Sequence, residues 1–192
     1  WVNVLVDNVH AGSEVGAPAR DVERGVKRLS FGVPVPATGE AVVKVGRAAL
    51  RDPVSFRFAW VGDVQGGLDN FARLREHVNR DPLVEFVVFA GDLTQGGSAD
   101  ETRDFVAAAD QLGRPWYAVF GNHETSWGHG VEFQQQVGRL NVAFDYRGAR
   151  FVLVDSASAT LDERVWELLR GQLAGAEPKT RLVAMHVPPL DP

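Results

Sequence analysis

The stretch YAVFGNHETSW, residues 117–127, joins a strand-like apolar run directly to a group of polar side chains. The apolar run ends at Gly121, and Asn122, His123 and Glu124 follow at once. A turn at the end of a strand needs a glycine and at most an asparagine, so the turn itself does not explain the histidine. We therefore predict that this strand ends at a functional site.

Strands and helices alternate along the chain from about residue 54 onward. Apolar runs predict strands at 56–61, 84–90, 115–120, 150–154 and 181–185, the fourth paired with 141–146 as a hairpin. Apolar residues at helical spacing predict a helix over 68–79 and two further helices, opened by the capping boxes Ser98–Glu101 and Thr160–Glu163. Strand–helix–strand alternation implies parallel pairing with right-handed crossovers, and hence an α/β layered fold.

Residues 1–53 do not share this alternation. They are rich in valine, glycine and proline, and they predict only short strands near residues 2–6 and 40–45. We interpret them as an appended N-terminal segment of unknown role, and residues 54–192 as the domain that carries the chemistry.

The composition is that of an ordinary globular protein, with 45% hydrophobic and 23% charged residues. The net charge of −5 argues against a general nucleic-acid or anionic-membrane binder, because both need a basic face. The chain has no cysteine, which excludes disulfides and thiolate metal sites. It also has no apolar run long enough for a membrane span. The compartment and the oligomeric state are left open.

Polar clusters follow the predicted strands at their carboxyl ends. Asp63 and Gln65 follow the first strand, Asp92 the second, Asn122 the third and His186 the last. Loops at this edge of an open α/β sheet converge over one crevice, so these side chains can meet in space. Carboxylate and amide oxygens suit hard divalent cations such as Mn²⁺ or Mg²⁺, and imidazole also suits Fe and Zn.

The segments GDVQ (62–65), GDLTQ (91–95), GNHE (121–124) and MH (185–186), in this order, resemble the motifs of the calcineurin-like metallophosphoesterases. The resemblance covers roughly residues 54–192, and the third motif is its most specific part. It implies a layered α/β sandwich of two mixed β-sheets flanked by helices. It also implies hydrolysis of a phosphate mono- or diester by a hydroxide activated at a dinuclear metal centre.

The resemblance implies a ligand set for two divalent cations. Asp92 would bridge both ions, Asp63 and Gln65 would bind the first, and Asn122 and His186 the second. Mn²⁺ is the expected metal, with Fe, Zn or Mg as alternatives, and a phosphoester is the expected substrate.

The same resemblance gives the neighbours of Asn122 a different role. His123 would be no ligand but would donate a proton to the leaving group, and Glu124 would steady that histidine. Adjacent residues would then divide the work, since Asn122 would bind metal while His123 would reach the departing oxygen.

Two features depart from the family pattern. Gln65 stands where most members have a histidine, and the amide oxygen is a weaker donor to Mn²⁺, Fe or Zn than imidazole. A Gly-His-x-His motif should follow His186 by a few tens of residues, and it is absent from these 192 residues. We therefore expect a C-terminally truncated domain.

Two rival interpretations stay open. The first is a catalytically degenerate binding or scaffold domain, which Gln65 and the missing motif favour. The second is a metal-dependent hydrolase that acts on something other than phosphate, and the adjacency of Asn122 and His123 argues against it.

Two tryptophans flank the third motif. We expect Trp116 in the core and Trp127 as a support for the loop, while the alternative for both is stacking on a nucleobase.

Overall fold

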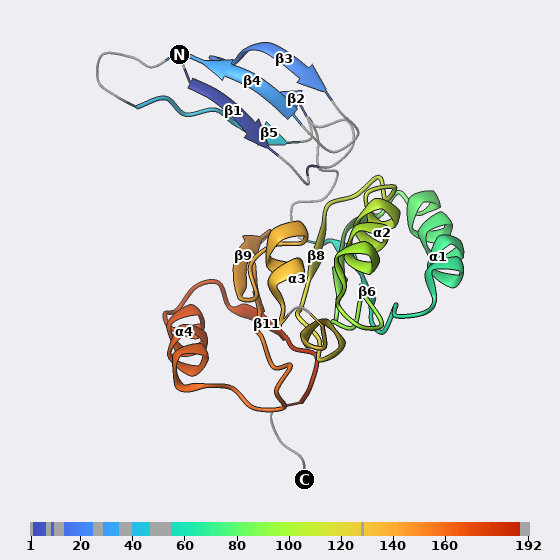
Figure 1. Cartoon of the computed structure of the whole chain (residues 1–192). Helices are drawn as coiled ribbons and strands as arrows, with labels where there is room; N and C mark the ends of the chain where they lie inside the picture. Colours follow the sequence, from blue (N-terminus) through green and yellow to red (C-terminus); the bar gives the residue numbers. More distant parts are fainter. Residues whose placement is uncertain are drawn as a thin grey trace.

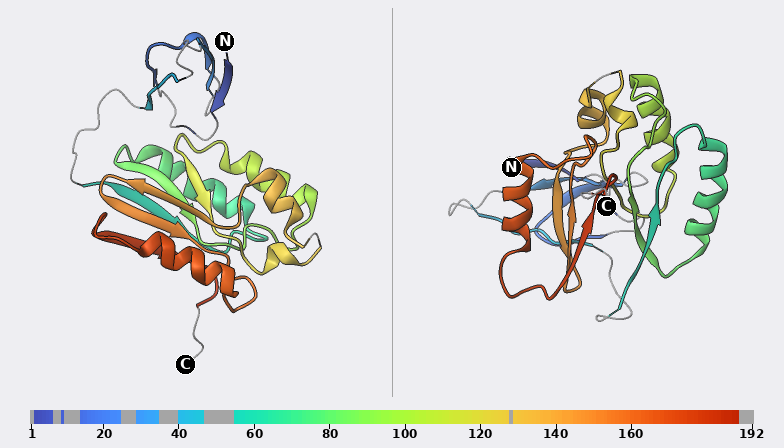
Figure 2. Two further views of the ribbon diagram at one scale, coloured as in Figure 1. Left: turned by 90° about the vertical axis from the view of Figure 1, so that its left-hand side faces the viewer. Right: turned by 90° about the horizontal axis from the view of Figure 1, so that it is seen from below.

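Two β-sheets packed face to face form the centre of residues 55–188, and helices cover both outer faces (Figures 1 and 2). This computed structural model describes residues 2–6, 9, 14–24, 29–34, 40–46, 55–127 and 129–188. The layers follow one another as helix, sheet, sheet and helix. The expected layered α/β sandwich is therefore confirmed.

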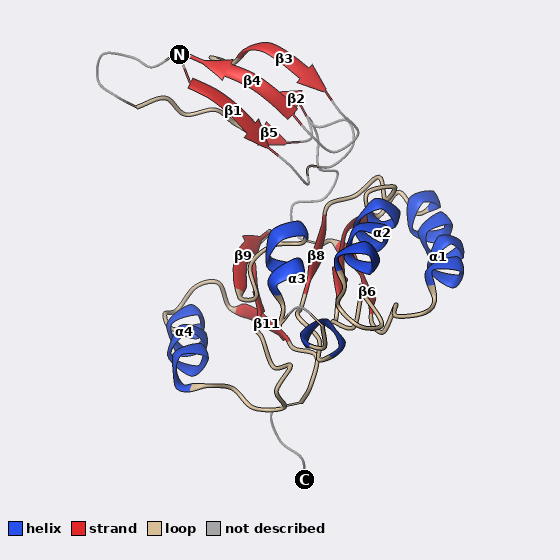
Figure 3. Cartoon of the chain, in the orientation of Figure 1, coloured by secondary structure: helices blue, strands red, loops and turns tan. Residues whose placement is uncertain are grey.

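The first sheet has the order β6-β7-β8, and both of its strand pairs are parallel. Its strands are β6 (Arg57–Val61), β7 (Val84–Phe89) and β8 (Trp116–Ala118). The connecting helices α1 (Leu68–Arg80) and α2 (Ala99–Ala109) lie against its outer face (Figure 3). The central strand, β7, is almost wholly buried, as expected for a parallel strand covered on both sides.

The second sheet has the order β11-β10-β9 and is mixed. Strand β9 (Val142–Tyr146) pairs antiparallel with β10 (Ala149–Leu153), and β10 pairs parallel with β11 (Thr180–Ala184). Helix α4 (Glu163–Leu173) connects β10 to β11 and covers the outer face. The short elements η1 (His123–Thr125) and α3 (Val131–Gln136) lie between β8 and β9.

Aromatic side chains fill the space between the two sheets. Phe86 of β7 is 3% exposed and lies at the centre of this cluster. Its ring packs against those of Phe56, Phe58, Tyr117, Phe144, Tyr146 and Phe151. Separate apolar clusters join the first sheet to α1 and α2 and the second sheet to α4. The apolar runs of the strands thus become the inner layers, and burial of this area is the main stabilising term.

Of the two predicted capping boxes, one forms. The Ser98 side chain accepts from the backbone N–H of Glu101, and the Glu101 carboxylate accepts from the N–H of Ser98, as predicted. Helix α4 is different, because its N-cap is Asp162, which accepts from the N–H of Val165. A carboxylate at the N-cap accepts this hydrogen bond at least as well as a threonine hydroxyl, so the helix begins two residues later than predicted.

The N-terminal strands form their own small sheets. The order β1-β4-β3 comprises β1 (Val2–Val6), β4 (Leu29–Val33) and β3 (Arg20–Arg24), all antiparallel, and β2 (Glu14–Val15) pairs with β5 (Val45–Gly46). Leu29, Phe31 and Val33 are buried in an apolar cluster made of residues from these strands and their neighbours. The strand predicted near residues 2–6 is present, and the one near 40–45 is reduced to β5.

No helix in the described part of the chain is both long enough and apolar enough to cross a membrane.

A buried charged cluster ties the two sheets together at the end away from the polar loops. Glu85 of β7 accepts a hydrogen bond from the Tyr146 hydroxyl and forms an ion pair with Arg147, at 3.0 Å. The side chains of Arg147 and Glu85 are only 7% and 13% exposed, and Arg147 also donates to the carbonyl of Ser55. Burial, with the Glu85 hydrogen bond, raises the pKa of Tyr146 to about 12. The cluster thus holds the β9–β10 turn against the first sheet.

We expect Glu85→Ala to lower the free energy of unfolding by about 3–5 kcal/mol, because it leaves Arg147 buried without its carboxylate partner. Denaturant unfolding measures this loss. Asp145→Ala is the matched control on the same hairpin, since it removes an exposed ion pair with Arg150 and should cost much less. Equal losses in the two variants would show that the Glu85 cluster does not hold the sheets together.

Candidate metal centre

Four strands of the sandwich deliver polar side chains to one edge. Asp63 follows β6, Asp92 follows β7, Asn122 lies just beyond β8 and His186 just beyond β11. One ligand atom from each of Asp63, Asp92 and His186 lies within 4.8 Å of the others. The Asn122 amide oxygen is 3.0 Å from the His186 Nε2 atom. The predicted convergence of these side chains is therefore present in the structure.

The two carboxylate oxygens of Asp92 face different neighbours. The Oδ1 atom lies 3.2 Å from Nε2 of His186, and it also accepts from the backbone N–H of His123. The Oδ2 atom accepts a hydrogen bond from Nε2 of Gln65, at 3.4 Å. Asp92 is 3% exposed, and within the described ranges no lysine or arginine pairs with it or with Asp63. A buried carboxylate needs a cation or hydrogen-bond donors, and the donors to Asp92 are the His123 backbone N–H and the Gln65 amide.

His186 presents a lone pair to the same space. Its Nδ1–H donates to the carbonyl oxygen of Ala90, at 2.8 Å. This hydrogen bond places the proton of a neutral imidazole on Nδ1, so Nε2 of that tautomer is an acceptor. Two oxygens lie near Nε2, Asn122 Oδ1 at 3.0 Å and Asp92 Oδ1 at 3.2 Å. All three atoms can then donate an electron pair. A proton or a metal ion between these atoms would make the arrangement favourable.

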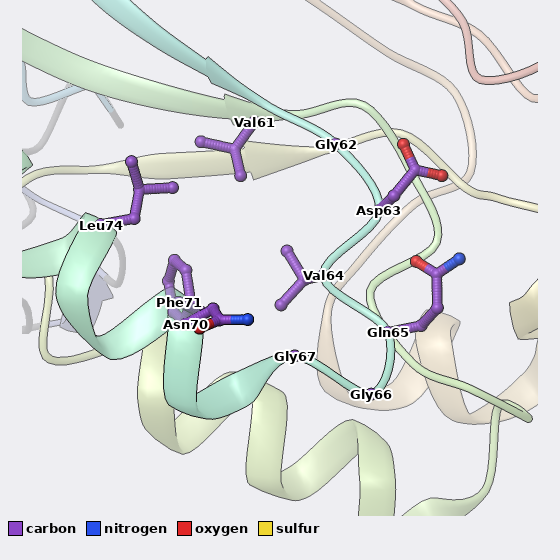
Figure 4. A pocket seen from close by; sticks show the side chains of 10 residues that line it. All are labelled: Val61, Gly62, Asp63, Val64, Gln65, Gly66, Gly67, Asn70, Phe71 and Leu74. Atoms are coloured by element: carbon purple, nitrogen blue, oxygen red, sulfur yellow. The ribbon is translucent and has the colours of Figure 1, made fainter.

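Gln65 contributes an amide to the opposite side of Asp92. Its Oε1 atom is buried and has no hydrogen-bond partner within the described structure. Figure 4 shows the side chains of Asp63 and Gln65 on one side of the 62–67 loop and that of Val64 on the other, towards α1. A cavity of about 530 Å³ lies along this loop and α1. The amide nitrogen of Gln65 donates to Asp92, and its orphaned buried oxygen is of the donor type that hard divalent cations prefer.

His123 lies beside these residues, with its ring held from behind. The Nδ1–H donates to the carbonyl of Gln95 at 2.7 Å, and Nε2 lies 3.8 Å from Oδ2 of Asp92. The Gln95 hydrogen bond, reinforced by the negative charges of Asp92, Glu124 and Asp63, raises the pKa of His123. The residue is therefore biased toward the protonated form that a proton donor requires.

Glu124 is the most connected side chain of the edge. It is 2% exposed, and its Oε2 atom accepts from the backbone N–H groups of Asp92 and Gly121, at 3.1 and 2.9 Å. Its Oε1 atom accepts from both the N–H and the hydroxyl of Thr94, each at 2.9 Å. Its contribution at His123 is electrostatic, whereas its hydrogen bonds clamp the loop after β7 to the loop after β8.

Two aspartates at this edge have a strained backbone, and two glycines allow its loops to approach closely. Asp63 and Asp92 have φ values of 54° and 53°, a left-handed conformation that side-chain-bearing residues rarely adopt. At Gly121, a Cβ atom would lie 2.3 Å from the backbone nitrogen of Asp92. At Gly91, with φ of 97°, it would lie 2.8 Å from the His186 ring. These two glycines let the loops approach closely enough to share Asp92.

Sequence reasoning missed the supporting contacts of the site. Thr94, 3% exposed, and the carbonyl of Gln95 hold Glu124 and His123 in place. A Thr-Gln pair one residue after a Gly-Asp turn was the available signal, but such residues are equally common in plain turns.

Comparisons with known proteins agree with this geometry. The family model for calcineurin-like phosphoesterases matches residues 56–190. The chain therefore belongs to the calcineurin-like phosphoesterase family.

A curated relative and a solved structure show how far the likeness extends. Over 65 residues, 34% of this chain and 23% of the relative, the chain is 35% identical to a symmetrical bis(5'-nucleosyl)-tetraphosphatase of Mannheimia succiniciproducens. The purple acid phosphatase PPD1 of yellow lupin (Lupinus luteus) seeds matches with a TM-score of 0.53 at 14% identity. That match covers 91% of this chain and 40% of the lupin chain, and it shows a shared fold. The chain spans less than half the length of either protein.

We expect Glu124→Gln to lower the free energy of unfolding by about 3 kcal/mol and to weaken Mn²⁺ binding. The amide nitrogen would face backbone N–H groups, which leaves buried donors without an acceptor. Chemical denaturation and calorimetric titration with Mn²⁺ measure the two effects.

Glu101→Gln is the matched control, because Glu101 also accepts from backbone N–H groups, those of Gly96 and Ser98, but at the start of α2. It should lose less stability and keep its Mn²⁺ affinity. Parent-like stability and metal affinity in Glu124→Gln would contradict the clamp.

Proposed function

We propose that this chain hydrolyses a phosphate ester with the help of two divalent cations held at the edge formed by β6, β7, β8 and β11. The observation that carries the proposal is the convergence of Asp63, Asp92 and His186, whose ligand atoms lie within 4.8 Å of one another. Asn122 and Gln65 extend this group on either side of Asp92. Membership of the calcineurin-like phosphoesterases supports the reaction class.

The two carboxylate oxygens of Asp92 have different neighbours, which supports two cation positions rather than one. Its Oδ1 atom lies 3.2 Å from Nε2 of His186, which in turn lies 3.0 Å from Oδ1 of Asn122, and its Oδ2 atom accepts from Nε2 of Gln65. In this proposal Asp92 is shared, Asp63 and Gln65 complete one position, and Asn122 and His186 the other. The mixture of carboxylate, amide and imidazole donors suits Mn²⁺ and also admits Fe, Zn or Mg.

Bound divalent cations would supply Lewis acidity, lowering the pKa of a coordinated water to about 7 and offsetting negative charge on the phosphoryl oxygens. His123 would act on the leaving group. A water would lose one proton to solvent and its oxygen would bond to phosphorus while the bond from phosphorus to the leaving oxygen breaks. His123 would give that leaving oxygen the proton of Nε2 and regain one from solvent. The hydrogen bond from Nδ1 to the Gln95 carbonyl keeps Nε2 turned toward Asp92.

The name of the Mannheimia relative suggests a substrate class to test. The Mannheimia protein is named as a nucleosyl tetraphosphatase. Nucleotide phosphate esters and anhydrides are therefore the first substrates to test, beside simple phosphomonoesters and diesters.

We expect Asp92→Asn to lose bound metal and hydrolytic activity together, because the shared carboxylate neutralises both cations. Mass spectrometry of the metal retained after Mn²⁺ loading and dialysis measures the first loss. Asp100→Asn is the control, since Asp100 is a carboxylate on the exposed face of α2. Full metal content in Asp92→Asn would refute the shared ligand. A parent chain that retains metal yet hydrolyses no ester would favour the degenerate binding domain.

We expect His123→Ala to keep its metal while kcat falls by about 10²–10⁴, the range typical of a lost general acid. The fall should be largest for substrates with poor leaving groups, because these depend most on protonation. Steady-state kinetics on a series of phosphate esters measures it, with His77→Ala, an exposed histidine on α1, as the control. Loss of metal in His123→Ala would reassign this residue as a ligand.

A further inference from the structure

One large aromatic side chain beside the candidate metal centre is left in solvent. Trp127 is 80% exposed, whereas Trp116, on the other side of the same motif, is 8% exposed and packs between Phe89 and Phe105. The expectation of a core position holds for Trp116. Trp127 leaves most of its ring in solvent, which loop support alone does not require.

The edge of the Trp127 ring is nevertheless held in place. Its backbone N–H donates to the carbonyl of Gly96 at 3.1 Å. A Cβ atom at Gly96 would lie 2.7 Å from Cδ1 of the indole, so the ring edge rests directly on the glycine backbone. Gly96 is in turn fixed by its N–H bond to the Glu101 carboxylate. The described structure gives the indole N–H no hydrogen-bond acceptor. A ring anchored by one edge leaves a face open to a planar ligand.

The Trp127 ring is supported by the same loop as His123, the residue proposed to protonate the leaving group. The residue before Gly96 is Gln95, whose carbonyl holds the imidazole of His123. Neighbouring residues are about 3.8 Å apart along the backbone, so the loop carries the supports of both rings side by side. The loop that orients His123 therefore also supports Trp127.

We propose that Trp127 stacks on the nucleobase of a nucleotide substrate and makes this chain selective for phosphate esters whose leaving group carries a base. This inference rests on the proposed function. Stacking suits a chain with a net charge of −5, because a neutral ring needs no basic surface to bind. A free nucleotide fits better than a nucleic-acid strand for the same reason, since a strand requires a positively charged groove.

The test compares two ligands that differ only in the base, adenosine 5'-monophosphate and ribose 5-phosphate. Their dissociation constants are measured by calorimetry on the full chain, with and without Mn²⁺. The variants are Trp127→Ala, Trp127→Phe and the control Trp166→Ala, an exposed tryptophan on α4 that is 40% exposed.

We expect Trp127→Ala to weaken binding of the adenosine ligand by roughly 5- to 150-fold, the usual loss for one base–aromatic stack. Binding of ribose 5-phosphate should not change, Trp127→Phe should keep much of the preference, and Trp166→Ala should match the parent. Equal affinities of the parent chain for the two ligands, or a Trp127→Ala variant with parent-like preference, would overturn the proposal.

Turnover measured on the same samples separates this proposal from the proposed function. A Trp127-dependent preference without hydrolysis of any ester would support the stacking platform and reject the catalytic role. Hydrolysis of both ligands with equal efficiency, unaffected by Trp127→Ala, would support the catalytic role and reject the platform.

Discussion

The carboxylate of Glu124 is the interaction on which the polar edge of this protein depends. It is buried between the loops that follow β7 and β8, and it accepts hydrogen bonds from Asp92, Thr94 and Gly121. A buried carboxylate is costly unless its oxygens are satisfied, and here backbone donors satisfy both. The result is a rigid junction in which the backbone of Asp92 stays in its left-handed conformation.

That junction determines what the other residues of the edge can do. With its backbone fixed, Asp92 offers one oxygen toward His186 and the other toward Gln65. The same loop carries the Gln95 carbonyl that orients His123 and the Gly96 backbone on which Trp127 rests. Binding and proton transfer would therefore draw on one preorganised loop, and preorganised groups act without a further reorganisation cost during the reaction.

The aromatic layer between the two sheets provides the support for this edge. His186 comes from β11 in the second sheet, while Asp63, Asp92 and Asn122 come from the first. Their distances depend on how the sheets pack, which Phe86 and its ring neighbours fix from inside and the Glu85–Arg147 pair fixes at the opposite end. Close-packed protein interiors transmit small shifts of side chains rather than absorbing them. Core substitutions far from Asp92 would therefore also alter the site.

The sequence by itself determined the order of strands and helices and the identity of the polar residues at their ends. Periodicity and Gly-Asp turns are local properties, and they correctly predicted the layered fold and the convergence of Asp63, Asp92, Asn122 and His186. It did not reveal the N-cap of α4, because Asp162 and Thr160 can both serve and only the path of the chain selects one.

Only the tertiary structure decided the contacts between loops. Glu124 bonds to groups about 30 residues away in the chain. The orphaned oxygen of Gln65 and the open face of Trp127 depend on which distant groups do not reach them. Hydrogen bonding and exposure at such positions arise when the sheets pack and the loops meet. No local pattern encodes that event, because residue type fixes what a side chain can bind, and packing fixes what lies within its reach.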